Sequence, residues 1–432
     1  MPRTHRIPPT IEGASAPPRL PGGGVGGRRR CAGRVLACGM AVLAGLAGPW
    51  LPGAGASAQT AAPGAANVVP LTVRTPRGGF NRMVVSVTGC APGTERCATI
   101  DDVMIDTGAT GLRLEASAVL AALRLPPLPG PEGRPLAECL RYVHDVAWGP
   151  LVRADLRIGG LTARDLPIQI IGDAGDAARA RPEACPRSDA RPTANGTLGL
   201  GPDPTDCRGA CVPDPDRPVT FACDAGGCAP LGGPVAPAHR LPNPVSRLPG
   251  HDNGVVIALP APPPEGAASV TGTLTFGVGT ADNNRLGSPA VVPLDRAGRF
   301  TTLYGGTAYP RSFIDSGTPT YILADAALPR CPGMAWAYCA APDRDRTATI
   351  LGRDGAPVPV PFRVGLSRAA LEGRVGASDR VAVAAEPASR AFVWGAPFFF
   401  GRRVAVLMDG QGVPGREDLR GPLYAFEALA PP

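Results

Sequence analysis

The stretches VMIDTGATGLRL (103–114) and SFIDSGTPTYIL (312–323) align without gaps on their aspartates, Asp106 and Asp315. In each copy, hydrophobic residues of strand character precede an Asp-Thr-Gly or Asp-Ser-Gly motif. A short loop and further apolar residues follow. A single motif of this kind is weak, because Asp and Gly are common in turns. Two copies in the same setting indicate an internal repeat.

A second hydrophobic element that contains glycine follows each copy of the motif. In the first half it is NGTLGLG (195–201), and in the second half it is VWGAPFFFGR (393–402). Because both elements occur in the same order after their aspartates, the repeat extends well beyond the motif. The sequence therefore predicts two related halves whose aspartates meet between them.

Composition favours strands over helices. The chain has 57 Gly and 53 Pro in 432 residues, and proline breaks helices while glycine destabilises them. Alternating, β-branched segments recur, for example at 68–75, 81–89, 254–260 and 271–279. We therefore expect a mainly β fold with few short helices, of which 116–123 is one candidate.

Two aspartates brought together can activate water for peptide hydrolysis. Neighbouring carboxyl groups cannot both ionise freely, so they share a proton. One then acts as a general base toward water, and the other polarises the substrate carbonyl. Hydroxyls beside each aspartate can bond across the pair, and glycines let backbone N–H groups approach it. The candidate catalytic residues are Asp106 and Asp315; the candidate supporting residues are Thr107, Gly108, Ser316, Gly317 and Thr318.

The chain resembles the pepsin-like aspartic-peptidase superfamily, and more closely a bacterial family of secreted proteins of unknown function with the same paired motifs. The resemblance implies a two-lobed fold with pseudo-two-fold symmetry. It also implies an aspartic endopeptidase that cleaves extended peptide or protein substrates without a cofactor or metal. It rests on 137–160, 195–201, 272–280, 312–318 and 394–404.

The sequence departs from the peptidase pattern at two places. Ala109 stands where the active enzymes of this superfamily usually carry a serine. Tyr142 falls where the resemblance places a flap tyrosine, and Trp148 follows on the return strand, but the usual residues of the flap tip are missing. Both aromatic residues could instead pack on the sheet. A non-catalytic peptide- or ligand-binding protein that retains the fold is therefore an alternative.

The first 58 residues have the pattern of a secretory signal peptide. Arginines at 28–30 and 34 precede an apolar run at 35–51, and Ala56-Ser57-Ala58 fits a cleavage site. A transmembrane anchor is the competing interpretation, although the run is short and interrupted by Gly and Pro. Without this leader the chain has 36 Arg and 35 acidic residues, which argues against nucleic-acid binding. We expect export to the periplasm or the exterior.

Ten cysteines follow the predicted leader, an even number that suits an oxidising compartment. Eight form four local pairs, and the other two are left to pair by exclusion. Zinc is the alternative for clustered cysteines, but the spacings and the scarcity of His disfavour it. The predicted pairs are Cys90 with Cys97, Cys207 with Cys211, Cys223 with Cys228, Cys331 with Cys339, and Cys139 with Cys185.

The predicted organisation has four parts. They are a leader (1–58), a linker (59–67), an N-terminal lobe (68–237) with the Asp106 motif, and a C-terminal lobe (238–432) with the Asp315 motif. We expect a monomer without a membrane span once the leader is removed.

Overall fold

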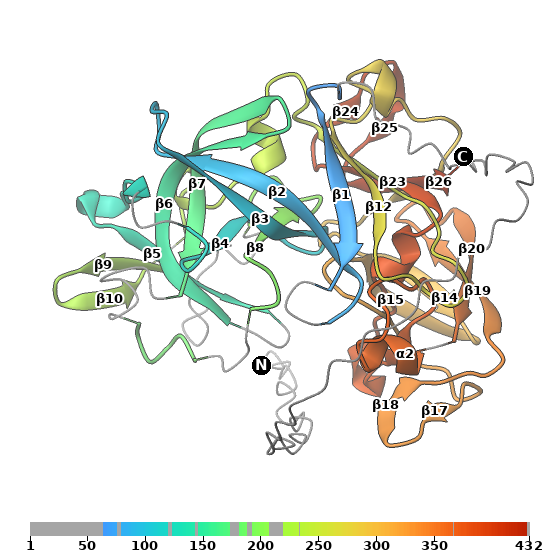
Figure 1. Ribbon diagram of the computed structural model, residues 1–432. Coiled ribbons are helices and arrows are strands. Elements are labelled where there is room, and N and C mark those ends of the chain that lie inside the picture. Colours follow the sequence, from blue (N-terminus) through green and yellow to red (C-terminus); the bar gives the residue numbers. More distant parts are fainter. Residues whose placement is uncertain are drawn as a thin grey trace, which may run out of the picture. The chain divides into compact units, whose positions relative to one another are not determined.

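The computed structural model describes residues 64–75, 79–119, 123–142, 146–172, 181–187, 192–206, 219–232, 234–365 and 367–429. The predicted leader lies outside these residues, as do Cys207 and Cys211. The chain from Ala61 onward forms one compact unit. Strands dominate it (Figure 1), so the expectation of a mainly β fold is confirmed.

Fifteen of the described strands form the larger sheet, which contains the first aspartate motif. Its order is β10 (Gly227–Pro230), β9 (Thr220–Asp224), β5 (Leu136–Arg141), β6 (Val146–Ile158), β7 (Leu161–Ile171), β4 (Thr110–Glu115), β8 (Gly196–Leu200), β3 (Cys97–Asp106), β2 (Arg82–Cys90), β1 (Val68–Arg74), β12 (Val270–Phe276), β11 (Gly254–Leu259), β23 (Arg402–Leu407), β26 (Leu423–Ala428) and β13 (Ala290–Pro293). The strand β1 pairs with β2 and β12 and thus links strands of the first half of the chain to strands of the second half.

Nine further described strands form the second sheet. One of them, β15, ends directly before Asp315 of the second motif. Its order is β17 (Arg330–Cys331), β18 (Met334–Tyr338), β21 (Ala382–Ala384), β16 (Tyr321–Leu323), β22 (Val393–Trp394), β15 (Thr307–Ile314), β14 (Phe300–Tyr304), β19 (Arg344–Leu351) and β20 (Pro357–Val364). The remaining described elements are β24 (Gly412–Val413), β25 (Arg416–Arg420), the short helix α2 (Ser367–Leu371) and the 3-10 turns Pro131–Gly133, Pro237–His239, Pro244–Arg247, Asp282–Asn284, Pro387–Ser389 and Ala396–Phe399.

The sequence repeat is also a repeat of topology. In the first half, β8 runs parallel to β3 and antiparallel to β4, so it lies between the strands that precede and follow the Asp106 loop. In the second half, β22 lies in the same way between β15 and β16. Each glycine-containing element therefore fills the same place beside its aspartate loop.

Aromatic side chains pack behind the second motif. The fully buried ring of Trp394 on β22 contacts Tyr321, Phe392 and Phe398, with centroids 4.5 to 5.9 Å apart. Trp394 also donates from Nε1 to Thr302 Oγ1 at 3.1 Å, so its single polar group is satisfied inside the core. This packing fixes β22, and β22 in turn pairs with the strand that ends at the second aspartate.

The expected helix at 116–123 is not present where the structure describes this segment. Residues 116–119 form turns, and 120–122 lie outside the described residues. The Ala116 N–H donates to Ile171 O at 2.8 Å, so the chain here continues its pairing with the sheet. Backbone pairing with β7 outweighs the helix propensity of this Ala- and Leu-rich stretch.

Candidate active site

Both aspartates lie at the ends of strands, and their side chains lie close together. Asp106 is the last residue of β3, and Asp315 directly follows β15. A side chain added at Gly108 would lie 2.8 Å from Cγ of Asp315, and one added at Gly317 would lie 2.6 Å from Cγ of Asp106. Each carboxyl group thus lies against the glycine of the other motif. Only glycine leaves room for this approach.

Reciprocal hydrogen bonds lock the two motif loops together. The Thr107 N–H donates to Ser316 Oγ at 3.0 Å, and the Ser316 N–H donates to Thr107 Oγ1 at 3.0 Å. The Ser316 hydroxyl donates onward to Ile105 O at 2.9 Å, and the Thr107 hydroxyl donates to Ile314 O at 3.2 Å. Since Thr107 and Ser316 are buried, these four bonds form a rigid, water-free base under the aspartates.

The carboxyl groups of Asp106 and Asp315 act on each other directly. Burial, followed by the negative charge and the hydrogen-bonding effect of Asp315, raises the pKa of Asp106 well above its usual range. Backbone N–H groups of Gly108 and Ala109 oppose the rise only in part. Asp106 therefore takes up a proton more readily than an ordinary exposed aspartate does.

The surroundings of the two aspartates differ by one hydroxyl. Asp315 accepts from the Gly317 N–H at 2.8 Å and from Thr318 Oγ1 at 2.6 Å. Asp106 accepts from the Gly108 N–H at 2.8 Å, but the residue that corresponds to Thr318 is Ala109, which has no hydroxyl. A hydroxyl donor favours the ionised form of a carboxyl group, so its lack at Ala109 adds to the burial that raises the pKa of Asp106.

A buried ionic cluster that sequence reasoning missed lies next to the first motif. Arg113 is fully buried and donates to Thr110 O at 2.5 Å, to Glu138 at 3.1 Å and to Asp206 at 2.9 Å. Burial, followed by the charge of Glu138, holds the pKa of Asp206 well above its usual range. The cluster joins β4, β5 and the segment after β8. Only the burial of Arg113, which the sequence does not reveal, distinguishes it from a surface arginine.

The two aromatic residues suggested for the flap have different surroundings. Tyr142 directly follows β5 at the hairpin tip, and its hydroxyl lies within electrostatic reach of the Arg113 guanidinium. Trp148 is 2% exposed and packs edge-on against Phe221, with ring centroids 5.2 Å apart. Trp148 thus belongs to a small core beside Cys139 and Cys185, and only Tyr142 remains a candidate for substrate contact.

Four disulfides occur among the described residues: Cys90–Cys97, Cys139–Cys185, Cys223–Cys228 and Cys331–Cys339. They confirm four of the five predicted pairs. The Cys139–Cys185 bond closes the longest of these four loops, with a sequence separation of 46.

The fifth predicted disulfide falls in a segment that the structure does not describe. Residues 207–218 lie outside the described ranges, and both Cys207 and Cys211 belong to this segment. The bond between Cys207 and Cys211 therefore stays a prediction from their spacing.

In the part of the chain that the structure describes, no helix has the length and apolar character needed to cross a bilayer.

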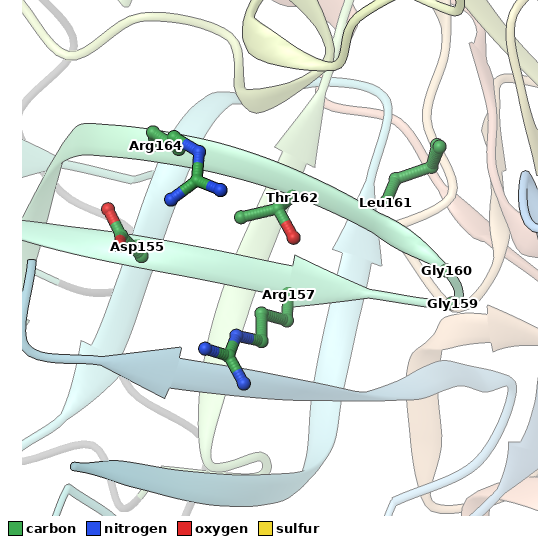
Figure 2. A pocket seen from close by; sticks show the side chains of 7 residues that line it. All are labelled: Asp155, Arg157, Gly159, Gly160, Leu161, Thr162 and Arg164. Carbon is green, nitrogen blue, oxygen red and sulfur yellow. The ribbon is translucent and has the colours of Figure 1, made fainter. Parts of the chain in front are cut away.

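A surface pocket of about 330 Å³ lies at the turn between β6 and β7, away from the aspartates (Figure 2). Its charged side chains take part in local structure. Asp155 accepts from the N–H groups of Gly93 and Asp165, and Arg157 pairs with Glu95. None of its lining residues belongs to either motif. The aspartate pair, and not this pocket, is therefore the candidate site.

Residues 63–426 match the sequence profile of a family described as "Protein of unknown function (DUF3443)". The chain belongs to this family. Comparison with curated proteins finds no match. Among solved structures, the aspartic proteinase from Irpex lacteus is similar with a TM-score of 0.52 and 14% identity, over 85% of this chain and 98% of that one. At this identity the likeness shows a pepsin-like fold and does not transfer an activity.

Proposed function

We propose that this member of the family is an exported aspartic endopeptidase, with Asp106 and Asp315 as its catalytic pair. The observation that carries the proposal is the contact between two carboxyl groups from duplicated motifs, held by the Thr107 and Ser316 bonds. Such an assembly keeps one proton and one negative charge in a fixed arrangement, which is what peptide hydrolysis by water requires.

The proton positions define the role of each aspartate. Asp315 removes a proton from water as the water oxygen attacks the peptide carbonyl carbon, and Asp106 gives its proton to the carbonyl oxygen. In the collapse of the tetrahedral intermediate, Asp315 returns its proton to the amine nitrogen as the C–N bond breaks. One hydroxyl of the intermediate then restores the proton of Asp106. Each turnover consumes one water and leaves both carboxyl groups as they began.

Neighbouring groups support the charged state of one aspartate and the protonated state of the other. Thr318 and the Gly317 N–H stabilise the charge on Asp315, and burial keeps Asp106 protonated. Tyr142, next to the tip of the β5–β6 hairpin, is the candidate to contact a bound peptide. The four disulfides fit a protein that works in the periplasm or outside the cell.

Hydrolysis of a denatured protein tests this proposal. The mature chain, from residue 59, is incubated with denatured casein between pH 3 and 8, and new amino termini are counted. Asp106→Asn and Asp315→Asn should each abolish cleavage, and Asp155→Asn at the β6–β7 pocket is the matched control that should retain it. If the wild type and both dyad variants release termini at the same rate, the enzymatic proposal is wrong.

Ala109 favours the second candidate function, a peptide-binding protein without catalysis. Its missing hydroxyl leaves Asp106 with weaker support than Asp315. The same incubation decides between the two, because a binding protein would retain intact peptides under conditions in which an endopeptidase destroys them.

A further inference from the structure

Two arginines flank the aspartate pair, and neither was singled out by the sequence motifs. Arg82 is the first residue of β2 and Arg299 directly precedes β14. β2 pairs with β3, which ends at Asp106, and β14 pairs with β15, which leads to Asp315. The arginines therefore occupy corresponding places in the two halves of the repeat.

Arg82 bridges the two motifs. Its Nη1 donates to Gly317 O at 2.9 Å and lies 3.5 Å from Sδ of Met104, which comes two residues before Asp106. Its Nε is buried and has no hydrogen-bond partner among the residues that the structure describes. Burial lowers the pKa of Arg82, while the charges of Asp106 and Asp315 raise it, so the guanidinium lies in the electric field of both aspartates.

Arg299 is placed in a similar way on the other half. Its Cζ lies 4.1 Å from the ring centroid of Phe313, two residues before Asp315. Because side chains alternate along a strand, Phe313 points to the same side as Asp315, just as Met104 points to the same side as Asp106. Burial lowers the pKa of Arg299; the other charged or titratable groups that act on it are Tyr424, Arg311, Asp295 and Asp315.

Among the described residues, no carboxylate forms an ion pair with Arg82 or Arg299. A pair of aspartates that shares one proton carries one negative charge. Asp295 and Arg311 also act on Arg299 and have opposite charges, so the two arginines leave a net positive charge around the pair. A partly dehydrated guanidinium without a carboxylate partner is costly, and its planar fork is suited to a carboxylate. An incoming acid would supply the missing partner.

We propose that Arg82 and Arg299 bind acidic side chains of the peptide, one on each side of the scissile bond. The inference rests on the proposed peptidase function and specifies its substrate class. An extended peptide bound over the dyad passes the Met104 side and the Phe313 side in turn, and successive side chains point in opposite directions. Glu or Asp residues on both flanks of the cleaved bond can therefore meet one guanidinium each.

Binding to a variant that cannot cleave tests this inference directly. Asp106→Asn removes the protonated member of the pair and leaves the charge of Asp315. Two labelled ten-residue peptides are compared by fluorescence polarisation at pH 6.5. One peptide has Glu, and the other has Gln, at the residue before and the residue after the central bond; the peptides are otherwise identical. The Glu peptide should bind at least about tenfold more tightly, because charge-assisted bonds to a guanidinium exceed those to an amide.

Substitutions in the Asp106→Asn background identify the residues responsible. Adding Arg82→Gln or Arg299→Gln should each remove much of the preference, and Arg82→Lys should keep part of it. The control Arg164→Gln, at an exposed position on β7, should leave the preference intact. The preference should also fade below about pH 4, where Glu takes up a proton while Arg stays charged. Equal affinities for the Glu and Gln peptides at pH 6.5 would overturn the inference.

The peptidase proposal can fail separately. If the wild type cleaves denatured casein with no enrichment of acidic residues around the new termini, the protein is a peptidase and the role of the arginines is wrong. If the wild type cleaves nothing but the inactive variant still prefers the Glu peptide, recognition of acidic peptides is correct and the peptidase proposal is wrong.

Discussion

At the scale of single residues, one side-chain hydroxyl distinguishes the two halves of the candidate site. Thr318 donates a hydrogen bond to Asp315, and Ala109 offers Asp106 none from its side chain. Since a donor to a carboxylate favours its ionised form, the missing hydroxyl acts in the same direction as the burial that raises the pKa of Asp106. The sequence alone reveals the substitution, but its consequence depends on the buried contact between the carboxyl groups.

Restoring the hydroxyl should change the pH profile. In Ala109→Ser, a donor to Asp106 would lower the raised pKa of this group. The alkaline limb of kcat/KM, where the shared proton is lost, should therefore move to lower pH by up to about one unit. Ala229→Ser, on the exposed strand β10, is the control and should leave the profile in place. An unmoved alkaline limb in Ala109→Ser would show that the missing hydroxyl does not set the proton affinity.

At the scale of elements, close backbone packing around the aspartate loops decides which residues are allowed. A side chain at Gly199 on β8 would lie 2.6 Å from Thr110 N, and one at Gly395 beside β22 would lie 2.0 Å from Thr320 O. The two glycines thus serve the same purpose in the two halves. Because they have no side chain, β8 can pack closely against β4 in the first half, and β22 against β16 in the second.

Filling this space should destabilise the protein. Gly199→Ala forces Cβ against backbone that cannot move aside, so we expect a loss of about 2–4 kcal/mol in the free energy of unfolding. Gly232→Ala is the matched control, because no atom lies within 4 Å of its added Cβ. Urea denaturation measures both variants. Similar midpoints for the two would mean that the strands can separate without cost.

The sequence predicted the elements that carry the aspartates better than their surroundings. Strand patterns before Asp106 and Asp315 and the glycine-containing elements were visible as local repeats. Arg82, Arg299 and the Arg113 cluster were not, because their role arises from contacts between segments far apart in the sequence. The expected helix at 116–123 was wrong for 116–119, because pairing with Ile171 is a tertiary effect that local propensity does not contain.

At the scale of the whole molecule, the site is built at the expense of stability. Asp106 is buried with its pKa raised mainly by that burial. The folded protein therefore binds a proton more tightly than the unfolded chain does. Stability from this group is greatest below the unfolded pKa of about 4 and decreases as the pH rises toward the folded value.

Neutralising Asp106 should relieve this cost. Relative to wild type, Asp106→Asn should gain stability as the pH rises from 4 to 7, by up to about 1.4 kcal/mol for each pH unit between the unfolded and folded pKa values. Urea unfolding of both proteins at several pH values gives the difference, in which other titrating groups largely cancel. A constant or decreasing difference would mean that Asp106 ionises as readily in the folded protein as in the unfolded chain.

The Thr107–Ser316 bonds join residues that are 209 positions apart in the chain. Contacts this distant form late in folding, because a long loop must close before they are made. During synthesis Asp106 emerges long before its partner, so the growing polypeptide carries only half of the pair. Under the proposed peptidase function, a chain in which only one half has folded would hold one aspartate and could not hydrolyse peptides until the two halves dock.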